Sequence, residues 1–130
     1  MIPKSTVKLV PGDYCLIPLS DGTSAAFAFL RSVPGKRSYF FGALLAPAFK
    51  PKGGDDLPST LEIVSQAMVH IKSFSDNNTP IVGNAESQIG RSHLAEAQKA
   101  CTDFSVGTTH NVWGSGTIIR RAERLRRQGG

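Results

Sequence analysis

The sequence has little of what builds disulfide-stapled, metal-held or membrane-embedded folds. Its 130 residues contain only two cysteines, Cys15 and Cys101, which are too few for a disulfide framework. No apolar run approaches the roughly 20 residues that span a bilayer. The N-terminal residues lack the basic and apolar regions of a secretion signal. We therefore expect one cytoplasmic domain over residues 1–130, without membrane contact and with a core large enough to need no staples.

The sequence also lacks a catalytic constellation. His70, His93 and His110 are scattered and match neither H-x-H nor H-E-x-x-H spacing, so converging zinc ligands are not expected. A nucleophile needs a neighbouring base. Cys101 with His93 or His110 is the pairing that the sequence leaves open, and no elbow motif surrounds it. We expect no enzyme activity, no catalytic residue, no metal and no cofactor, with a small hydrolase as the alternative.

Apolar runs separated by turn residues dominate the first part of the chain. Asp21-Gly22 between two runs is a strong hairpin signal, and Pro34-Gly35 marks a second turn. Because parallel strands need a crossover of about a dozen residues, such short links favour an antiparallel meander. Both parities are mostly apolar, so both sheet faces should be covered, one as a barrel interior and the other by a helix or another chain. The runs are residues 14–19, 24–33 and 39–46.

The remaining sequence predicts short helices and further strands. Ser59 and Glu62 form a capping-box pattern, which predicts a helix with Leu61, Ile63 and Val64 on its inner side. The later expected elements are strands over 67–74 and 80–84, a helix over 92–100, one or two closing strands near residue 105 and over 111–119, and a helix over 119–127. The fold class is therefore α+β and mainly β. We expect an antiparallel meander forming a small, partly open barrel, with two or three short helices including the C-terminal one.

Two features near the C-terminus have alternative interpretations. Gly114-Ser115-Gly116 lacks the further glycine of a dinucleotide-binding loop and the lysine of a P-loop, so we interpret it as a tight turn between strands. Trp113 is most simply a core anchor. An exposed Trp113 would instead be a candidate partner-binding residue.

Positive charge is concentrated at the C-terminus. The net charge is +5, and the basic tail, residues 120–130, holds five arginines against Glu123. Such a tail can bind an acidic protein or nucleic-acid phosphate, or it can be a solvated helix end favoured by the macrodipole. No aromatic platform interleaved with arginine is present, so an acidic protein is favoured over nucleic acid. The candidate partner-binding residues are Trp113, Arg120, Arg121, Arg124 and Arg127.

A further pattern runs through the start of the meander. In order, it holds Gly12-Asp13, an apolar pair, Pro18-Leu19, Asp21-Gly22 and an Ala/Phe-rich strand. This order resembles the opening of the immunity protein 26 family, bacterial proteins of polymorphic toxin systems. Residues 61–64 before the strand at 68–74, and residues 80–84, are similar to later segments of that family, so the resemblance covers about residues 12–84. It implies a protein that binds and neutralises a toxin, with no catalytic residue to carry over.

The expected function is therefore non-catalytic binding of a cognate toxin, which the basic tail suggests is acidic. The alternative is a small nucleic-acid-binding barrel that uses the arginine-rich tail. A homodimer is compatible with the same sequence.

Overall fold

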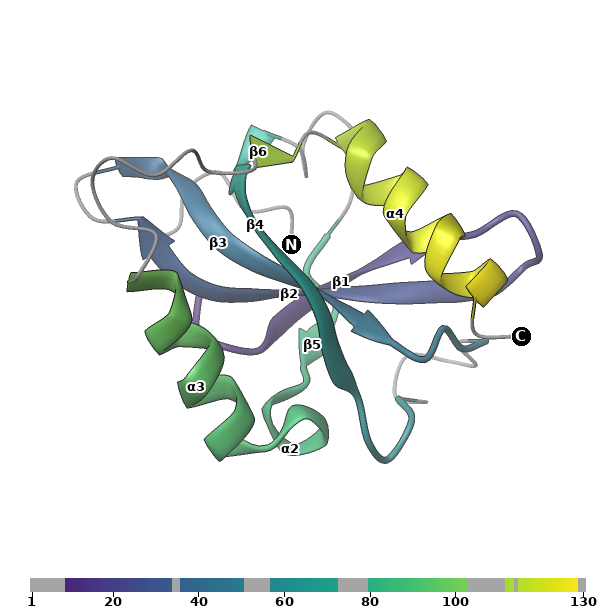
Figure 1. Cartoon of the computed structure of the whole chain (residues 1–130), viewed down its shortest axis with the longest axis horizontal. Coiled ribbons are helices and arrows are strands. Elements are labelled where there is room, and N and C mark those ends of the chain that lie inside the picture. Colours follow the sequence, from purple (N-terminus) through teal and green to yellow (C-terminus); the bar gives the residue numbers. More distant parts are fainter. Residues whose placement is uncertain are drawn as a thin grey trace.

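The structure, a computed structural model, describes residues 9–33, 36–50, 57–72, 80–102, 112–113 and 115–128. Figure 1 shows how the elements are arranged. In chain order they are β1 (Asp13–Pro18), β2 (Ser24–Val33), β3 (Lys36–Ala46), β4 (Glu62–His70), β5 (Gly83–Asn84), α2 (Glu86–Ile89), α3 (Arg91–Thr102), β6 (Val112–Trp113) and α4 (Ser115–Gln128).

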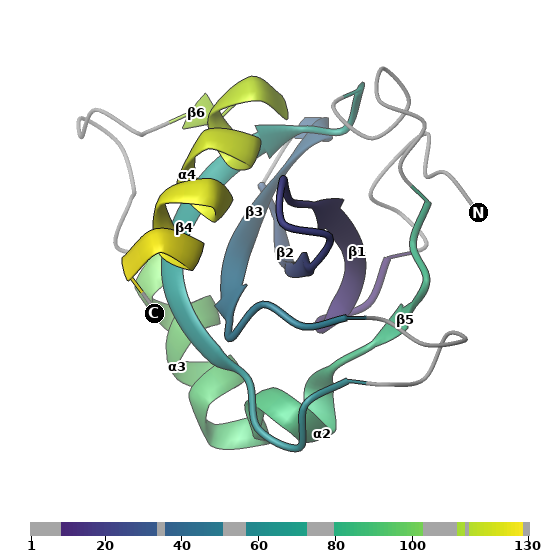
Figure 2. The same cartoon turned by 90° about the vertical axis from the view of Figure 1, so that its right-hand side faces the viewer.

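The strands form one sheet in the order β5-β1-β2-β3-β4-β6. Neighbours pair antiparallel except β4 and β6, which pair in parallel. The predicted meander is confirmed, since β1, β2 and β3 are consecutive both in the chain and in the sheet. Over the described residues the sheet stays open, ending at β5 and β6, and Figure 2 shows β4 arching around the curved interior. The predicted α+β, mainly β fold with a partly open barrel is therefore confirmed.

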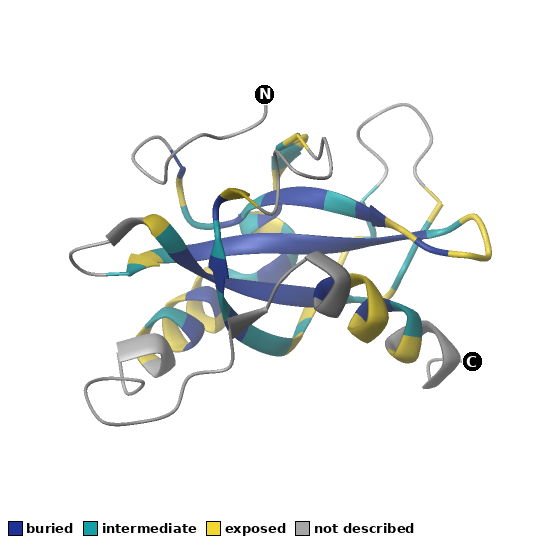
Figure 3. Cartoon of the chain, turned by 90° about the horizontal axis from the view of Figure 1, so that it is seen from above, coloured by how far each residue is buried: buried dark blue, intermediate teal, exposed yellow. Residues whose placement is uncertain are grey.

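Both faces of the sheet are buried, as the apolar pattern predicts (Figure 3). Along β2, Phe27 and Phe29 belong to a first hydrophobic cluster, whereas Ala28 and Leu30 belong to a second. The first cluster takes in residues of α4, and the second takes in residues of α2 and α3. Figure 1 accordingly places α3 and α4 on opposite sides of the sheet. The sequence leaves open whether a helix or another chain covers the second face. In the structure, the helices α2 and α3 of the chain itself cover it.

The first cluster depends on a glycine beneath an aromatic ring. Phe27 and Phe40 are fully buried and meet edge-on, with ring centroids 6.4 Å apart. A Cβ atom added to Gly42 of β3 would lie 2.6 Å from Cε1 and Cζ of Phe27 and 2.9 Å from Cε2 of Phe40. Carbon atoms do not approach so closely without repulsion. The aromatic rings therefore occupy the space that any other side chain at position 42 would need.

The helix predicted from Ser59 and Glu62 is wrong. Residues 59 and 60 are not helical, and Glu62 begins β4, which pairs with β3 along its whole length. Ile63 and Val64 are β-branched and suit a strand. Pairing with β3 also satisfies backbone groups that a single helical turn would leave open. The strand predicted over 67–74 thus starts five residues earlier and ends at His70, and residues 73 and 74 lie outside the described residues.

The closing strand predicted over residues 111–119 is largely wrong as well. Among the described residues of that range only β6 is extended, and α4 begins at Ser115, four residues before the predicted helix. The turn predicted for the Gly-Ser-Gly motif is corrected too, because Ser115 and Gly116 start α4. Ile118 and Ala122, one helical turn apart, are both buried, which explains the earlier start. The strand predicted near residue 105 lies outside the described residues.

One later prediction is confirmed and another is confirmed in part. Helix α3 covers the predicted range 92–100, and Leu94 and Ala97 are buried on its inner side. The strand predicted over 80–84 is present only at its last two residues, as β5, which pairs with the start of β1.

A single side chain joins β5 to the start of β1. Asn84 donates from Nδ2 to Pro11 O at 3.1 Å and to Asp13 Oδ1 at 3.0 Å. Its Oδ1 accepts a hydrogen bond from Glu86 N at 2.9 Å, at the start of α2. Gly12 has a φ of +94°, a conformation that glycine adopts without steric cost. This corner holds α2, and the start of α3 behind it, against the second face of the sheet.

Candidate partner-binding site

Helix α4 has a buried side and a cationic side. Ile118 and Ala122 are 4% and 1% exposed and pack into the first hydrophobic cluster. Arg120, Arg121 and Arg124 are exposed. Residues three and four positions apart are neighbours on a helix surface. The structure therefore brings three of the predicted residues together, and we call them the cationic side of α4.

A side-chain contact fixes α4 on the β1–β2 hairpin. The Glu123 carboxylate accepts hydrogen bonds from Ser20 N at 2.6 Å and from Ser20 Oγ at 2.9 Å. The hairpin turn is itself ordered by Asp21, whose Oδ1 accepts a hydrogen bond from Thr23 N at 3.0 Å. Charged acceptors make stronger hydrogen bonds than neutral ones. Together with the buried inner side, this contact gives the cationic side a defined position, so residues 120–128 are part of the fold rather than a loose tail.

The other two predicted residues are placed through their backbones. Trp113 pairs with Val69 of β4 in the parallel ladder between β4 and β6. Arg127 belongs to the last turn of α4. Both side chains lie outside the described part of the structure, so the core and partner-binding interpretations of Trp113 stay predictions.

The residues considered for catalysis do not converge in the described part of the chain. Cys15 is buried in β1, and this burial raises the pKa of its thiol to about 12, so it stays protonated and unreactive at neutral pH. Cys101 and His93 both belong to α3, where their backbones lie eight residues, about 12 Å, apart along the axis. His70 Nδ1 accepts a backbone N–H two residues further on at 3.1 Å. His110 lies outside the described residues.

Metal-binding side chains are likewise dispersed. In the segments that the structure describes, no group of three or more His, Cys, Asp or Glu side chains is arranged to hold a metal ion.

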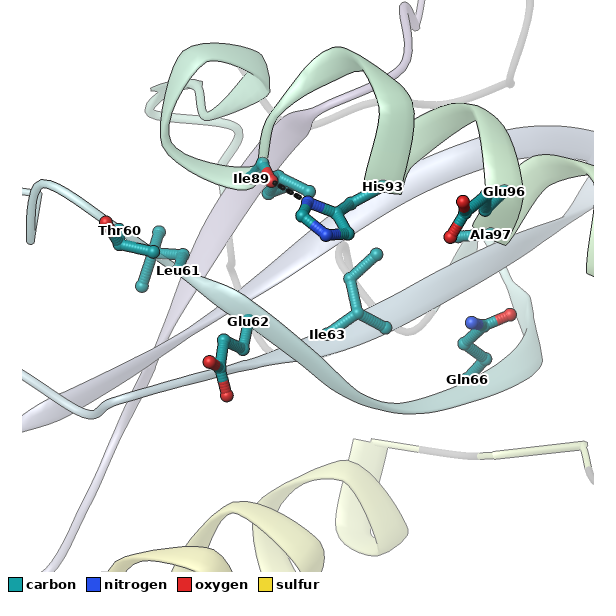
Figure 4. A pocket seen from close by; sticks show the side chains of 9 residues that line it. All are labelled: Thr60, Leu61, Glu62, Ile63, Gln66, Ile89, His93, Glu96 and Ala97. Carbon is teal, nitrogen blue, oxygen red and sulfur yellow. Dashed lines mark hydrogen bonds between the residues drawn. The ribbon is translucent and has the colours of Figure 1, made fainter.

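A groove of about 440 Å³ opens between β4 and α3 (Figure 4). Leu61, Ile89 and Ala97 are almost fully buried and form an apolar floor. His93 and Glu96 of α3 are exposed and stand along one wall. Figure 4 shows the His93 ring facing Ile63 and the Glu96 carboxylate above Gln66. The remaining lining residues are Thr60, Glu62, Ile63 and Gln66, and we call this feature the β4–α3 groove.

A β-bulge in β4 shapes the groove. Two consecutive residues of β3 pair with Ser65 and Ile63 of β4, so Val64 is an extra residue in the ladder. Successive residues of a regular strand point to opposite faces. In a regular strand, residues 63 and 66 are three positions apart and would therefore lie on opposite faces. The bulge turns Ile63 toward α3 and leaves Glu62 pointing away from it, as Figure 4 shows.

No pattern in the sequence predicts this groove as a whole. Its α3 wall has a signal, because His93, Glu96 and Ala97 are spaced as neighbours on one side of a helix. The β4 wall has none, since residues 61–64 are predicted as helix and no residue type marks Val64 as a bulge.

Comparison of the chain with protein families, with curated proteins and with solved structures gives no significant match. The resemblance to the immunity protein 26 family therefore stays a prediction. Within the segments described, no helix is both long enough and apolar enough to cross a bilayer.

Proposed function

We propose that the chain is a non-catalytic binding protein of the bacterial cytoplasm that holds an acidic protein partner with the cationic side of α4. We further propose that this partner is a cognate toxin, which binding neutralises. The toxin assignment is supported by the resemblance of residues 12–84 to the immunity protein 26 family. The binding role is supported by one observation above all, the fixed position of a cationic helix side on the sheet.

The spacing of the three arginines suits recognition of carboxylates. Arg120 and Arg124 are one helical turn apart, so their backbones are separated by about 6 Å along the axis, with Arg121 between them. Guanidinium groups form paired hydrogen bonds with carboxylates, and arginine is enriched at protein interfaces. Ile119, which is 39% exposed, adds apolar area beside the charges. An apolar neighbour favours a protein surface over a phosphate backbone.

The test is binding to the protein encoded by the adjacent gene, first by pull-down and then by titration calorimetry. The variant reverses all three charges: Arg120→Glu, Arg121→Glu and Arg124→Glu. We expect about a hundredfold loss of affinity, because desolvated interface charges become repulsive. A toxicity-rescue assay in cells should lose protection in parallel.

The matched control makes the same charge change elsewhere, on the exposed residues Lys50, Lys72 and Lys99. We expect this control to keep most of the affinity. Equal losses in both variants, or unchanged affinity in the α4 variant, would contradict the assignment of this surface. Tight, steeply salt-dependent binding to DNA or RNA without binding to the protein would replace the proposal by the nucleic-acid alternative.

A further inference from the structure

We propose that the β4–α3 groove binds a small organic cation, an alkylamine that carries an aromatic ring. The ring lies on the apolar floor of the groove, and the ammonium group lies beside His93 and Glu96 on the α3 wall. This site is separate from the cationic side of α4, and the proposal does not rest on the function proposed above.

The shape of the groove suits a small molecule. Its volume of about 440 Å³ is within the range in which proteins bind organic molecules. The floor residues Leu61, Ile89 and Ala97 are at most 5% exposed, so the groove reaches down to the second hydrophobic cluster. Ile63, which the bulge turns toward α3, adds an apolar side. A flat ring that enters between β4 and α3 reaches this floor and is buried there, whereas a broad protein surface is held off by the two walls.

The charges of the groove favour a cation. Its lining includes two glutamates and neither lysine nor arginine, although the whole chain has a net charge of +5. Glu62 points away from α3, so Glu96 is the carboxylate that a ligand in the groove would meet (Figure 4). The Glu96 side chain is exposed and forms no ion pair with another described residue. An anion would be repelled by this carboxylate, whereas an ammonium group would be attracted to it.

His93 adds a hydrogen-bond acceptor beside Glu96. Its Nδ1 lies 3.2 Å from Ile89 O. A carbonyl oxygen only accepts, so Nδ1 is the donor in this hydrogen bond, and Nε2 of the neutral ring is left as an acceptor. Figure 4 shows Nε2 on the side of the ring that faces Ile63. Because His93 and Glu96 are three residues apart, they are neighbours on α3, and an ammonium group has enough donors to bond to both.

The probe is tryptamine, and its matched controls replace the ammonium group on the same indole ring. Tryptophol carries a hydroxyl group there, and indole-3-propionate carries a carboxylate. Each compound is titrated into the ¹⁵N-labelled full chain at about pH 8, where imidazole is neutral and alkylamines are protonated. We expect saturable shifts of the amide signals of Ile63, His93 and Ala97 at millimolar tryptamine. At low salt tryptamine should bind about threefold more tightly than tryptophol, and indole-3-propionate should bind most weakly.

Two glutamate variants test the charge contact. Glu96→Gln keeps the size of the side chain and should abolish the preference for tryptamine over tryptophol. Glu62→Gln makes the same change at the groove residue that points away from α3, and it should retain the preference. Equal loss of the preference in both variants, or an unchanged preference in Glu96→Gln, would overturn the ammonium contact.

Two lysine variants of β4 test the location of the ring. Ile63→Lys places an ammonium group of the chain itself in the groove and should abolish tryptamine binding. Val64→Lys is the matched control, because Val64 is 40% exposed and does not line the groove, and it should still bind tryptamine. The amide spectrum of each variant shows whether it is folded. Unchanged binding by a folded Ile63→Lys variant would overturn the assignment to this groove.

The remaining outcomes decide the class of ligand. Absence of saturable shifts of the groove signals with tryptamine would overturn the proposal. So would tighter binding of the lysine peptide acetyl-Gly-Lys-Gly-amide than of tryptamine, which would assign the groove to a protein partner. The triple arginine variant of α4 should still bind tryptamine, so failure of one proposal does not imply failure of the other.

Discussion

Replacing Gly42 by alanine should destabilise the protein, although a glycine-to-alanine change inside a strand ordinarily stabilises it. The new methyl group would lie 2.6 Å from two ring atoms of Phe27 and 2.9 Å from one of Phe40. Both rings are fully buried in the first hydrophobic cluster, so neither can rotate into solvent. Overpacking of this kind costs about 1–3 kcal/mol. Because three contacts are under 3.0 Å, we expect Gly42→Ala to lower the free energy of unfolding by about 3 kcal/mol, at the upper end of that range.

A double-mutant cycle with Phe27→Leu identifies the cause. Leucine lacks the two ring atoms that the new methyl group would meet, so the double variant should be more stable than the sum of the single losses predicts. We expect an interaction free energy between the two substitutions of at least about 1 kcal/mol, measured by urea unfolding followed by circular dichroism. Strictly additive losses, or a loss under about 0.5 kcal/mol for Gly42→Ala, would refute the packing described for this cluster.

Three further perturbations follow from other contacts. Glu123→Ala should lower the free energy of unfolding by about 1 kcal/mol, because two hydrogen bonds from the exposed Ser20 are lost; Ser20→Ala should then cost less in the Glu123→Ala background than in the parent chain. Asn84→Ala should cost about 1 kcal/mol and speed amide exchange in α2, since its carboxamide joins β5, β1 and the start of α2; unchanged exchange would contradict that role. Burial raises the pKa of the Cys15 thiol from 9.0 to about 12. The stability contributed by keeping this thiol neutral is therefore complete below pH 9 and is lost as pH rises toward 12, and Cys15→Ala should show a shallower fall in the free energy of unfolding above pH 9 than the parent chain.

The meander could be predicted because its signals are local. Asp21-Gly22 marks a hairpin wherever it stands between apolar runs. The two apolar parities of β2 indicate two buried faces without reference to distant residues. The strand predicted over residues 24–33 consequently has the bounds that the structure shows.

The errors lie where distant contacts decide between competing local signals. The capping-box pattern at Ser59 and Glu62 favours a helix locally, but it was outweighed by pairing of β4 with β3, a contact the local pattern does not report. The helix α4 starts early for a similar reason, because burial of Ile118 against the sheet extends its inner side by one turn. Neither sheet pairing nor helix docking is visible in a window of a few residues.

The burial of the sheet also limits the surfaces at which a partner can bind. Helix α4 packs on one face of the sheet and α2 and α3 pack on the other, so β2 and the middle of β3 are buried on both faces. What remains are the outer sides of the helices and the edges of the sheet. On α4 the outer side carries Arg120, Arg121 and Arg124. On the opposite side of the sheet, the bulge at Val64 turns Ile63 into the β4–α3 groove, which has Glu96 on its wall. Because the sheet lies between these two surfaces, a change in the cationic side of α4 should leave the β4–α3 groove intact.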